Sequence, residues 1–179
     1  WVELGLQTIH EQTAAFIRRG YTLPCFETAF AALQRIGIPV ITHLILGLPG
    51  ETTDMILESI SYLNRLHPFG VKLQLLHILK DTDLGRLYLR GEVHPLQKKE
   101  YLDLVIDCIR RLSPDIVIHR LTGDGPANLL LSPEWSRNKR DVLNSLHRQL
   151  KQRSARQGDL YHHFSEKEDH HVTGSADTL

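Results

Sequence analysis

The chain has 179 residues, and its 21 Lys and Arg are matched by 21 Asp and Glu, so the formal net charge is zero. Without a net charge, no overall field draws the protein to nucleic acid or to an anionic membrane. The two cysteines exclude a disulfide scaffold, and they exclude a four-cysteine zinc or iron–sulfur site built from this chain alone. No apolar run reaches the roughly 18 residues of a membrane span, and none resembles a secretion signal, so we expect a cytoplasmic protein without membrane contacts.

Short apolar runs in the sequence predict buried β-strands. Such continuous runs, without polar alternation, are typical of a parallel sheet whose two faces are both covered. The four runs are residues 2–6, 38–46, 71–76 and 116–118.

Amphipathic helices are predicted by apolar residues that recur at helical spacing between and after these strands. The first of them has Thr22 as its N-cap, Pro24 in its first turn and Gly37 as its stop. Because strand and helix alternate, the fold class is α/β with a parallel sheet and outer helices. Both an open doubly wound sheet and part of a (β/α) barrel satisfy this pattern. The helical stretches are residues 26–36, 56–63, 102–112 and 142–150.

Charge is unevenly distributed toward the C-terminus. Residues 136–157 carry seven Lys or Arg against the single acid Asp141, which predicts a basic helix. Residues 158–179 carry five acidic residues against one Lys and have few core-forming side chains, so we expect a disordered polar tail.

Polar segments follow all four predicted strands. In parallel α/β folds the carboxyl ends of the strands meet at one rim, where ligands bind. The segments begin at Gln7, Gly47, His77 and His119, and the last of them contains Asp124. We expect a site on this rim, and surface loops without a ligand remain the alternative.

The second of these segments is a glycine-bearing turn that enters a helix. Gly47 and Gly50 permit a positive φ or a close backbone approach, and Glu51 suits a helix N-terminus. The turn is not the G-x-G-x-x-G fingerprint, and no G-x-x-x-x-G-K-[ST] loop occurs in the sequence. Nucleotide binding through these two devices is therefore excluded.

A metal site is the other chemistry that these segments allow. His43, His77, His119 and Asp124 could together hold a divalent metal in a (β/α)-barrel hydrolase. No H-E-x-x-H motif or similarly short spacing supports that interpretation.

Three stretches taken together resemble the second half of a radical S-adenosylmethionine (radical SAM) domain. They are VELGLQT at residues 2–8, RRGYT at residues 18–22 and HLILGLPGE at residues 43–51. Their order and spacing are similar to the branch that includes the Elongator catalytic subunit. Residues 118–126 and 134–139 also resemble the YhcC-like family within that superfamily.

The resemblance implies a fold and a reaction. Residues 1–135 would form the C-terminal half of a partial (β/α)6 TIM-like barrel, on which the basic helix of residues 136–157 packs. The family's [4Fe–4S] cluster reductively cleaves SAM to a 5′-deoxyadenosyl radical, with an electron donor such as a flavodoxin or ferredoxin. Related branches modify tRNA, so tRNA is an expected partner, with the basic helix contacting its phosphates. A solvated helix that merely closes the barrel is the alternative.

Roles for individual residues also follow from the resemblance. Gln7 would contact SAM, and Arg19 would meet the SAM carboxylate, which a guanidinium can bind in a bidentate fashion. Ile45 would pack on the adenine, Glu51 would hold its turn, and the backbone of residues 77–79 would meet the adenine edge. The full expected set for the cofactor is Gln7, Arg19, His43, Ile45, Gly47, Glu51, His77 and Leu79, with His119 and Asp124 as substrate contacts.

The sequence departs from the family in its cysteines. The family binds its cluster through three closely spaced cysteines, whereas Cys25 and Cys108 lie far apart in predicted helices. We therefore expect the C-terminal portion of a longer enzyme, which starts within a strand at Trp1 and has its ligating cysteines outside this chain. By itself the portion would neither bind the cluster nor cleave SAM. The alternative functions are the metal-dependent hydrolase and a non-catalytic RNA-binding module built on the basic helix.

Overall fold

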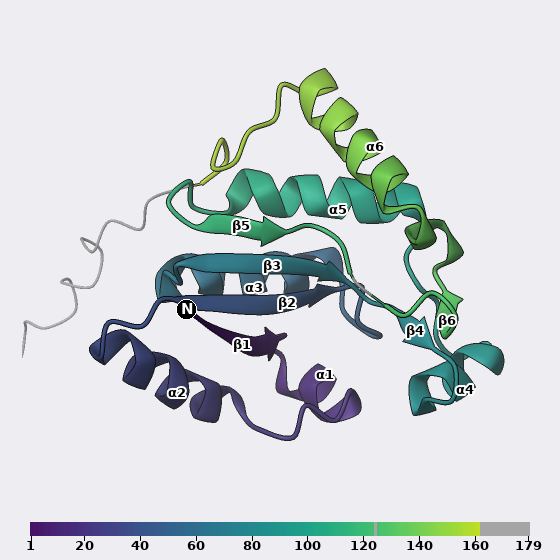
Figure 1. Ribbon diagram of the computed structural model, residues 1–179, viewed down its shortest axis with the longest axis horizontal. Helices are drawn as coiled ribbons and strands as arrows, with labels where there is room; N and C mark the ends of the chain where they lie inside the picture. The colour runs from purple at the N-terminus through teal and green to yellow at the C-terminus, as the bar shows by residue number, and fades with distance from the viewer. Residues whose placement is uncertain (124, 162–179) are drawn as a thin grey trace, which may run out of the picture.

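The computed structural model describes residues 1–123 and 125–161, and the predicted polar tail lies almost wholly outside the described residues (Figure 1). The strands are β1 Val2–Gln7, β2 Val40–Leu46, β3 Gly70–Leu75, β4 Ile78–Leu79, β5 Val117–Arg120 and β6 Leu130–Ser132. The helices are α1 Glu11–Phe16, α2 Leu23–Arg35, α3 Thr53–Leu66, α4 Asp83–Leu89, α5 Lys98–Arg111, the 3-10 helix η1 Glu134–Arg137 and α6 Lys139–Gln152.

Four of the strands form one parallel sheet in the order β1-β2-β3-β5. In Figure 1 all four arrows point the same way, toward a smaller antiparallel sheet of β4 and β6 that lies beyond their carboxyl ends. The parallel sheet and the outer helices confirm the predicted α/β architecture.

The face of the sheet toward α2, α3 and α5 is the hydrophobic core, here called the outer face. Because strand side chains alternate, every second residue of β2 and β3 points into it. Leu44 and Leu73 are 2% and 0% exposed there. The helices supply Phe30 from α2, Ile60 from α3 and Val105 from α5 to the same cluster. Figure 1 shows α3 running behind β2 and β3 on that side.

Threonine side chains cap the starts of α2 and α3, and the first of them is the predicted Thr22. The Thr22 hydroxyl accepts a hydrogen bond from the Cys25 N–H and starts α2. Thr52 does the same for the Met55 N–H at the start of α3. These caps satisfy N–H groups that a first helical turn otherwise leaves unpaired.

The third predicted strand, residues 71–76, appears as β3 with bounds one residue earlier in the chain. β3 ends at Leu75, and Ile78 and Leu79 form the separate strand β4, which pairs with β6. Residues 77–79, whose backbone was expected at the adenine edge directly after the third strand, are therefore partly taken up by a second sheet. The cause is the later segment around Leu130, which supplies a partner strand that local apolar periodicity does not reveal.

The basic helix α6 packs on α5. Val142 and Leu146 of α6 are 2% and 1% exposed and belong to the core. After α6 the chain returns to the connection between α5 and β5, where the Gln157 Nε2 donates to the carbonyls of Ser113 and Ile116 at 2.8 and 2.7 Å. No helix among the described residues is long and apolar enough to span a bilayer.

Candidate active site

A cavity of about 510 Å³ lies at the carboxyl ends of β1, β2 and β3. Its base is formed by Gln7, Ile45, Leu48 and Leu76, which follow or end the three strands. Its sides come from the end of α1 and from the start of α4, at Phe16, Ile17, Arg18, Thr82, Asp83, Leu84 and Leu87. A largely apolar pocket with a few polar groups, at this rim of a parallel sheet, is the usual form of a small-molecule site.

The backbone at Gln7 is held in an unusual conformation. Its φ is +64°, in the left-handed region that non-glycine residues rarely adopt, and the pairing of β1 with β2 shifts register just before it. Such a conformation costs about 1–2 kcal/mol and persists where its surroundings enforce it, often at ligand sites. Here the residue in this conformation is Gln7, whose side chain lines the cavity.

The turn after β2 is fixed to the end of β1. Gly47 has a φ of +85°, which favours glycine, and a Cβ there would lie 2.9 Å from Leu96 Cδ1, so another residue would strain the backbone and displace the Leu96 side chain. The Thr8 hydroxyl donates to the Glu51 carboxylate, and the Glu51 N–H donates to the Leu48 carbonyl. Burial raises the pKa of Glu51 above its usual value, although the hydrogen bond from Thr8 opposes the shift. Glu51 thus connects the two strand ends beside the cavity.

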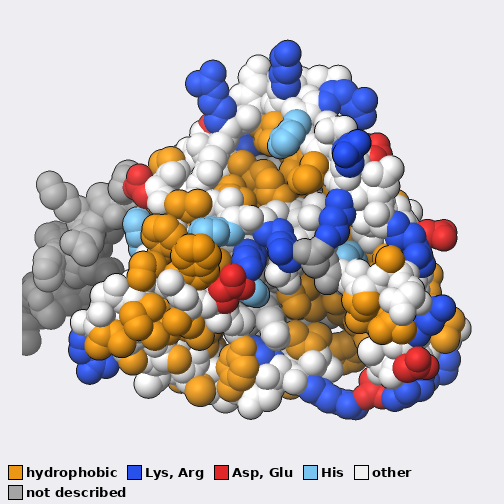
Figure 2. Space-filling view, viewed as in Figure 1, with side chains coloured by type: hydrophobic (Ala, Val, Ile, Leu, Met, Phe, Trp, Pro, Cys, Tyr) orange, Lys and Arg blue, Asp and Glu red, His pale blue; other side chains and the backbone are white. Residues whose placement is uncertain are grey.

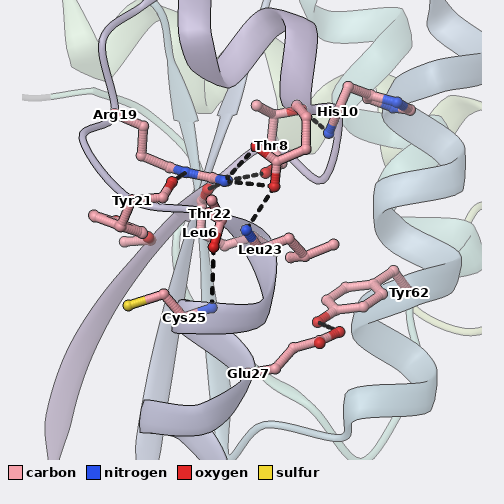
Figure 3. A network of polar contacts seen from close by, with 12 residues as sticks. Leu6, Thr8, His10, Arg19, Tyr21, Thr22, Leu23, Cys25, Glu27 and Tyr62 are labelled. Carbon is pink, nitrogen blue, oxygen red and sulfur yellow. Dashed lines mark hydrogen bonds and ion pairs between the residues drawn. The ribbon is translucent and has the colours of Figure 1, made fainter.

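Arg19 lies in a saturated network rather than in the cavity (Figure 3). Its side chain is 0% exposed. Its Nη1 donates to the carbonyls of Leu6 and Thr8 at 3.1 and 2.8 Å, its Nε donates to the Tyr21 carbonyl at 2.8 Å, and its Nη2 reaches Glu11 at 3.3 Å. Because every nitrogen of the guanidinium already has a protein acceptor, Arg19 would have to exchange one of these partners to meet a SAM carboxylate, and that contact stays a prediction.

His77 and Leu79 do not line the cavity either. The imidazole of His77 packs against the later loop, where a Cβ on Gly125 would lie 2.7 Å from its Nδ1. Burial and the nearby Lys139 lower the pKa of His77. Leu79 is paired within β4 and β6, and its carbonyl accepts from the Thr82 hydroxyl at 2.8 Å. Leu76, one residue earlier, takes the place at the cavity that was predicted for His77.

The face of the sheet opposite the core, here called the inner face, is polar in the middle. Its central side chains are Glu3 of β1, His43 of β2 and Lys72 of β3. Glu3 Oε2 accepts from His43 Nε2 at 2.8 Å and from Lys72 Nζ at 2.5 Å. Burial and the Lys72 charge lower the pKa of His43, and they outweigh the opposing hydrogen bond to Glu3. In Figure 2, basic, acidic and histidine side chains meet over the middle strands.

His119 lies inside β5 rather than after it, so it is not on the carboxyl-end rim. It covers Gly70 at the amino end of β3, where a Cβ would lie 2.7 Å from His119 Nε2. Its ring lies 6.0 Å from that of Trp1 and 5.9 Å from that of Phe69. The expectation that His119 closes its strand is therefore wrong, and Asp124 lies outside the described residues.

Family models match nearly the whole described chain. Residues 1–63 match the model described as the radical SAM superfamily, and residues 68–152 match that of the radical SAM C-terminal domain. The chain belongs to the radical SAM superfamily. Its similarity to YhcC of Escherichia coli and to Elongator complex protein 3 of Mus musculus places it in the branch that includes these two proteins.

Among its relatives, the chain is 39% identical to YtqA of Bacillus subtilis over 167 residues, which are 93% of this chain and 52% of that protein. It is 31% identical to YhcC of Escherichia coli K12 over 150 residues, which are 84% of this chain and 48% of YhcC. It is 29% identical to the tRNA uridine(34) acetyltransferase of Methanocaldococcus jannaschii over 134 residues, which are 73% of this chain and 25% of that enzyme. The chain thus spans about half the length of YtqA and YhcC.

The fold agrees with this assignment. The solved structure of Methanocaldococcus infernus Elp3 with an N-terminal deletion matches at a TM-score of 0.75 and 20% identity, over 87% of this chain and 36% of that one. The architecture is therefore the predicted portion of a TIM-like barrel.

The cysteines do not fit the family's iron–sulfur cluster. Cys25 is exposed in α2, and Cys108 is fully buried in α5, where burial raises the pKa of its thiol. Within residues 1–123 and 125–161, no three His, Cys, Asp or Glu side chains are grouped so that they could hold a metal ion. Ligands for a cluster must therefore come from outside these residues, and the predicted hydrolase site is not formed by His43, His77 and His119.

Sequence reasoning missed much of the cavity wall. Leu48 and Leu76 follow from neighbouring predicted residues, but Ile17 and the residues of α4 were not expected there. The sequence does carry a signal for the start of α4, because Thr82 before Asp83 is a good helix N-cap. The Thr82 hydroxyl accepts from the Gly85 N–H at 2.9 Å.

Proposed function

We propose that this chain forms the SAM-binding side of a radical SAM enzyme that modifies tRNA, with the cluster held by residues outside the chain. The cavity at the carboxyl ends of β1, β2 and β3 is the observation that supports this function. When bound, the cluster supplies the electron that cleaves SAM to the 5′-deoxyadenosyl radical, and a flavodoxin or ferredoxin would reduce it.

The residues of this chain would bind and orient the nucleoside. Ile45, Leu48 and Leu76 form an apolar base of the cavity that suits a flat adenine ring. The Gln7 amide can both donate and accept hydrogen bonds, as recognition of ribose hydroxyls requires. The Thr8–Glu51 hydrogen bond and Gly47 fix the turn that carries Leu48, and Arg19 fixes the end of β1.

The test uses the full-length protein, reconstituted anaerobically with iron and sulfide, and measures 5′-deoxyadenosine formed per cluster. Gln7→Gly should lower this rate about tenfold, the equivalent of one lost hydrogen bond. The same change relieves the strained φ, so the fold should be at least as stable as in the wild type. Gln12→Ala, at an exposed residue of α1, is the matched control. Formation of 5′-deoxyadenosine that Gln7→Gly does not slow would count against the cavity as the SAM site.

The exposed face of α6 supports tRNA as the partner. Arg140, His147, Arg148 and Lys151 are all exposed and recur at helical spacing, opposite the buried Val142. Figure 2 shows Lys and Arg side chains gathered over this helix. Such a stripe suits a phosphate backbone.

Charge reversal tests this partner. Arg148→Glu with Lys151→Glu should weaken tRNA binding and reduce its salt dependence, because two phosphate contacts are lost. Arg35→Glu, on the exposed surface of α2, should leave binding unchanged. Undiminished binding in the double variant would exclude α6 as the contact. Binding of tRNA by a full-length protein that never forms 5′-deoxyadenosine would favour the RNA-binding module instead.

A further inference from the structure

The inner face carries a row of polar side chains below the proposed SAM cavity. His43, Lys72 and Arg120 are in register across β2, β3 and β5, and Glu3 joins the row from β1. Ile45, which lines the cavity, comes two residues after His43 on the same face of β2. The row therefore lies about 7 Å deeper in the barrel than the cavity, since a strand rises about 3.3 Å per residue.

Lys72 is the group in this row with unused bonding capacity. Its side chain is 14% exposed, and an ammonium has three N–H groups to satisfy. Within the described part of the chain, its bond to Glu3 Oε2 at 2.5 Å is the one hydrogen bond that Lys72 makes. Two N–H groups of a mostly buried cation are thus left for water or for a ligand, and a buried ammonium is stabilised best by an anionic acceptor.

Glu3 fixes the positions of His43 and Lys72 without using all the N–H groups of Lys72. A single oxygen, Oε2, accepts from both His43 and Lys72, and the Glu3 side chain is 38% exposed. The carboxylate therefore orients the Lys72 ammonium along the sheet. Its negative charge also weakens the attraction of Lys72 for any other anion.

We propose that Glu3, His43 and Lys72 form a substrate subsite, in which Lys72 binds an anionic oxygen group of the substrate, a carboxylate or a phosphate. The assignment rests on the proposed function, because a radical formed in the cavity above reacts with whatever group is held within the barrel beneath it. The subsite itself is a binding site and can be tested without turnover.

The experiment follows the His43 imidazole by NMR in the full-length protein labelled at histidine, near pH 8, about 1.5 units above an ordinary imidazole pKa. Acetate and inorganic phosphate are titrated separately at constant ionic strength with chloride. We expect at least one probe to shift the His43 signal saturably, and the tighter probe identifies the group as carboxylate or phosphate. No saturable shift with either probe would overturn the proposal.

Three variants separate anion binding from a structural role. Lys72→Met should abolish the shift, and Lys72→Arg should restore it because the cation is kept. Glu3→Gln should tighten anion binding severalfold, because it removes the competing negative charge. A purely structural Glu3 predicts the opposite, so weaker binding in Glu3→Gln, or unchanged binding in Lys72→Met, would refute the subsite.

Lys99→Met is the matched control, since Lys99 on α5 is 85% exposed and far along the chain from β3; its response should equal that of the wild type. Formation of 5′-deoxyadenosine is measured on the same preparations. Anion binding without 5′-deoxyadenosine would reject the proposed function and keep the subsite, and the reverse result would reject the subsite alone.

Discussion

The two faces of the four-stranded sheet are made by alternate residues of the same strands, yet the middle of one face is apolar and the middle of the other is charged. On the outer face, Leu44 and Leu73 pack among the side chains of α2, α3 and α5. On the inner face, His43 and Lys72, their immediate neighbours in sequence, form an ion-pair and hydrogen-bond network with Glu3. One residue along a strand thus separates a dry core from a polar wall.

This difference assigns separate tasks to the faces. The outer face provides stability, because burying apolar area is the main driving force of folding. The inner face keeps charged groups half-buried, which contributes little stability and serves recognition instead. Substitutions on the two faces should therefore have very different effects.

The largest difference is expected between two neighbours on β3. Leu73→Ala should lower the free energy of unfolding by about 3 kcal/mol, because the side chain is 0% exposed in the core. Lys72→Ala should cost less than about 1 kcal/mol, because the Glu3 carboxylate that loses its partner is 38% exposed and can be solvated by water. Urea unfolding of the full-length protein measures both. Equal losses would show that the inner face is a second core and not the wall of a site.

Arg19 should behave like the core although it is charged. Arg19→Met should lower the free energy of unfolding by about 2–3 kcal/mol, because the Leu6 and Thr8 carbonyls would lose buried donors. Folded molecules of the variant should still bind SAM, at most severalfold more weakly, because Arg19 fixes the end of β1 without lining the cavity. Normal stability combined with lost SAM binding would support the role that the family resemblance implies.

Glu51 tests the connection between the strand ends. Its raised pKa means that its contribution to stability is complete below the ordinary value of 4.5 and is lost as the pH rises through the value in the folded protein. At neutral pH, Glu51→Gln should therefore be neutral or stabilising, since an amide oxygen can still accept from Thr8. Glu51→Ala should cost about 1 kcal/mol by leaving that hydroxyl unpaired. Thermal unfolding of both variants decides, and a loss in Glu51→Gln would mean that the charge itself is needed.

The smallest effect should come from His43. Because burial and Lys72 lower its pKa, the folded protein resists protonating it, and stability falls as the pH drops from 6.5 through the lowered value. His43→Gln should remove this part of the pH dependence and leave stability near neutral pH almost unchanged. Thermal unfolding of the wild type and of His43→Gln across this pH range measures the difference. An equal change of stability with pH in both proteins would contradict the lowered pKa of His43.

The sequence predicts the regular part of the fold well. Strands at Val40–Leu46 and Gly70–Leu75 appear as apolar runs, and the predicted cap at Thr22 marks the start of α2. The small sheet of β4 and β6 could not be predicted, because its partners lie about fifty residues apart and each is only two or three residues long.

The candidate site could be predicted only in part, because some of its contacts also join distant parts of the chain. Gln7 and Ile45 lie at the cavity because strand ends converge wherever a parallel sheet forms. Arg19 matched a family motif, but its partners are backbone carbonyls, which leave no trace in side-chain patterns. The Glu3–His43–Lys72 contact joins three strands, so it becomes visible only when their register is known.

The Gln157 amide, which donates to the Ser113 and Ile116 carbonyls, sets a limit on how the chain can be shortened. A version ending before this residue would keep every strand and helix among the described residues. At the connection between α5 and β5, however, the Ile116 carbonyl would lose the Gln157 donor, and the Ser113 carbonyl would keep only the Ile116 N–H. Shortened forms that stop at residue 156 and at residue 161 should therefore differ in protease resistance at that connection, and the longer one is the better starting point for crystallisation.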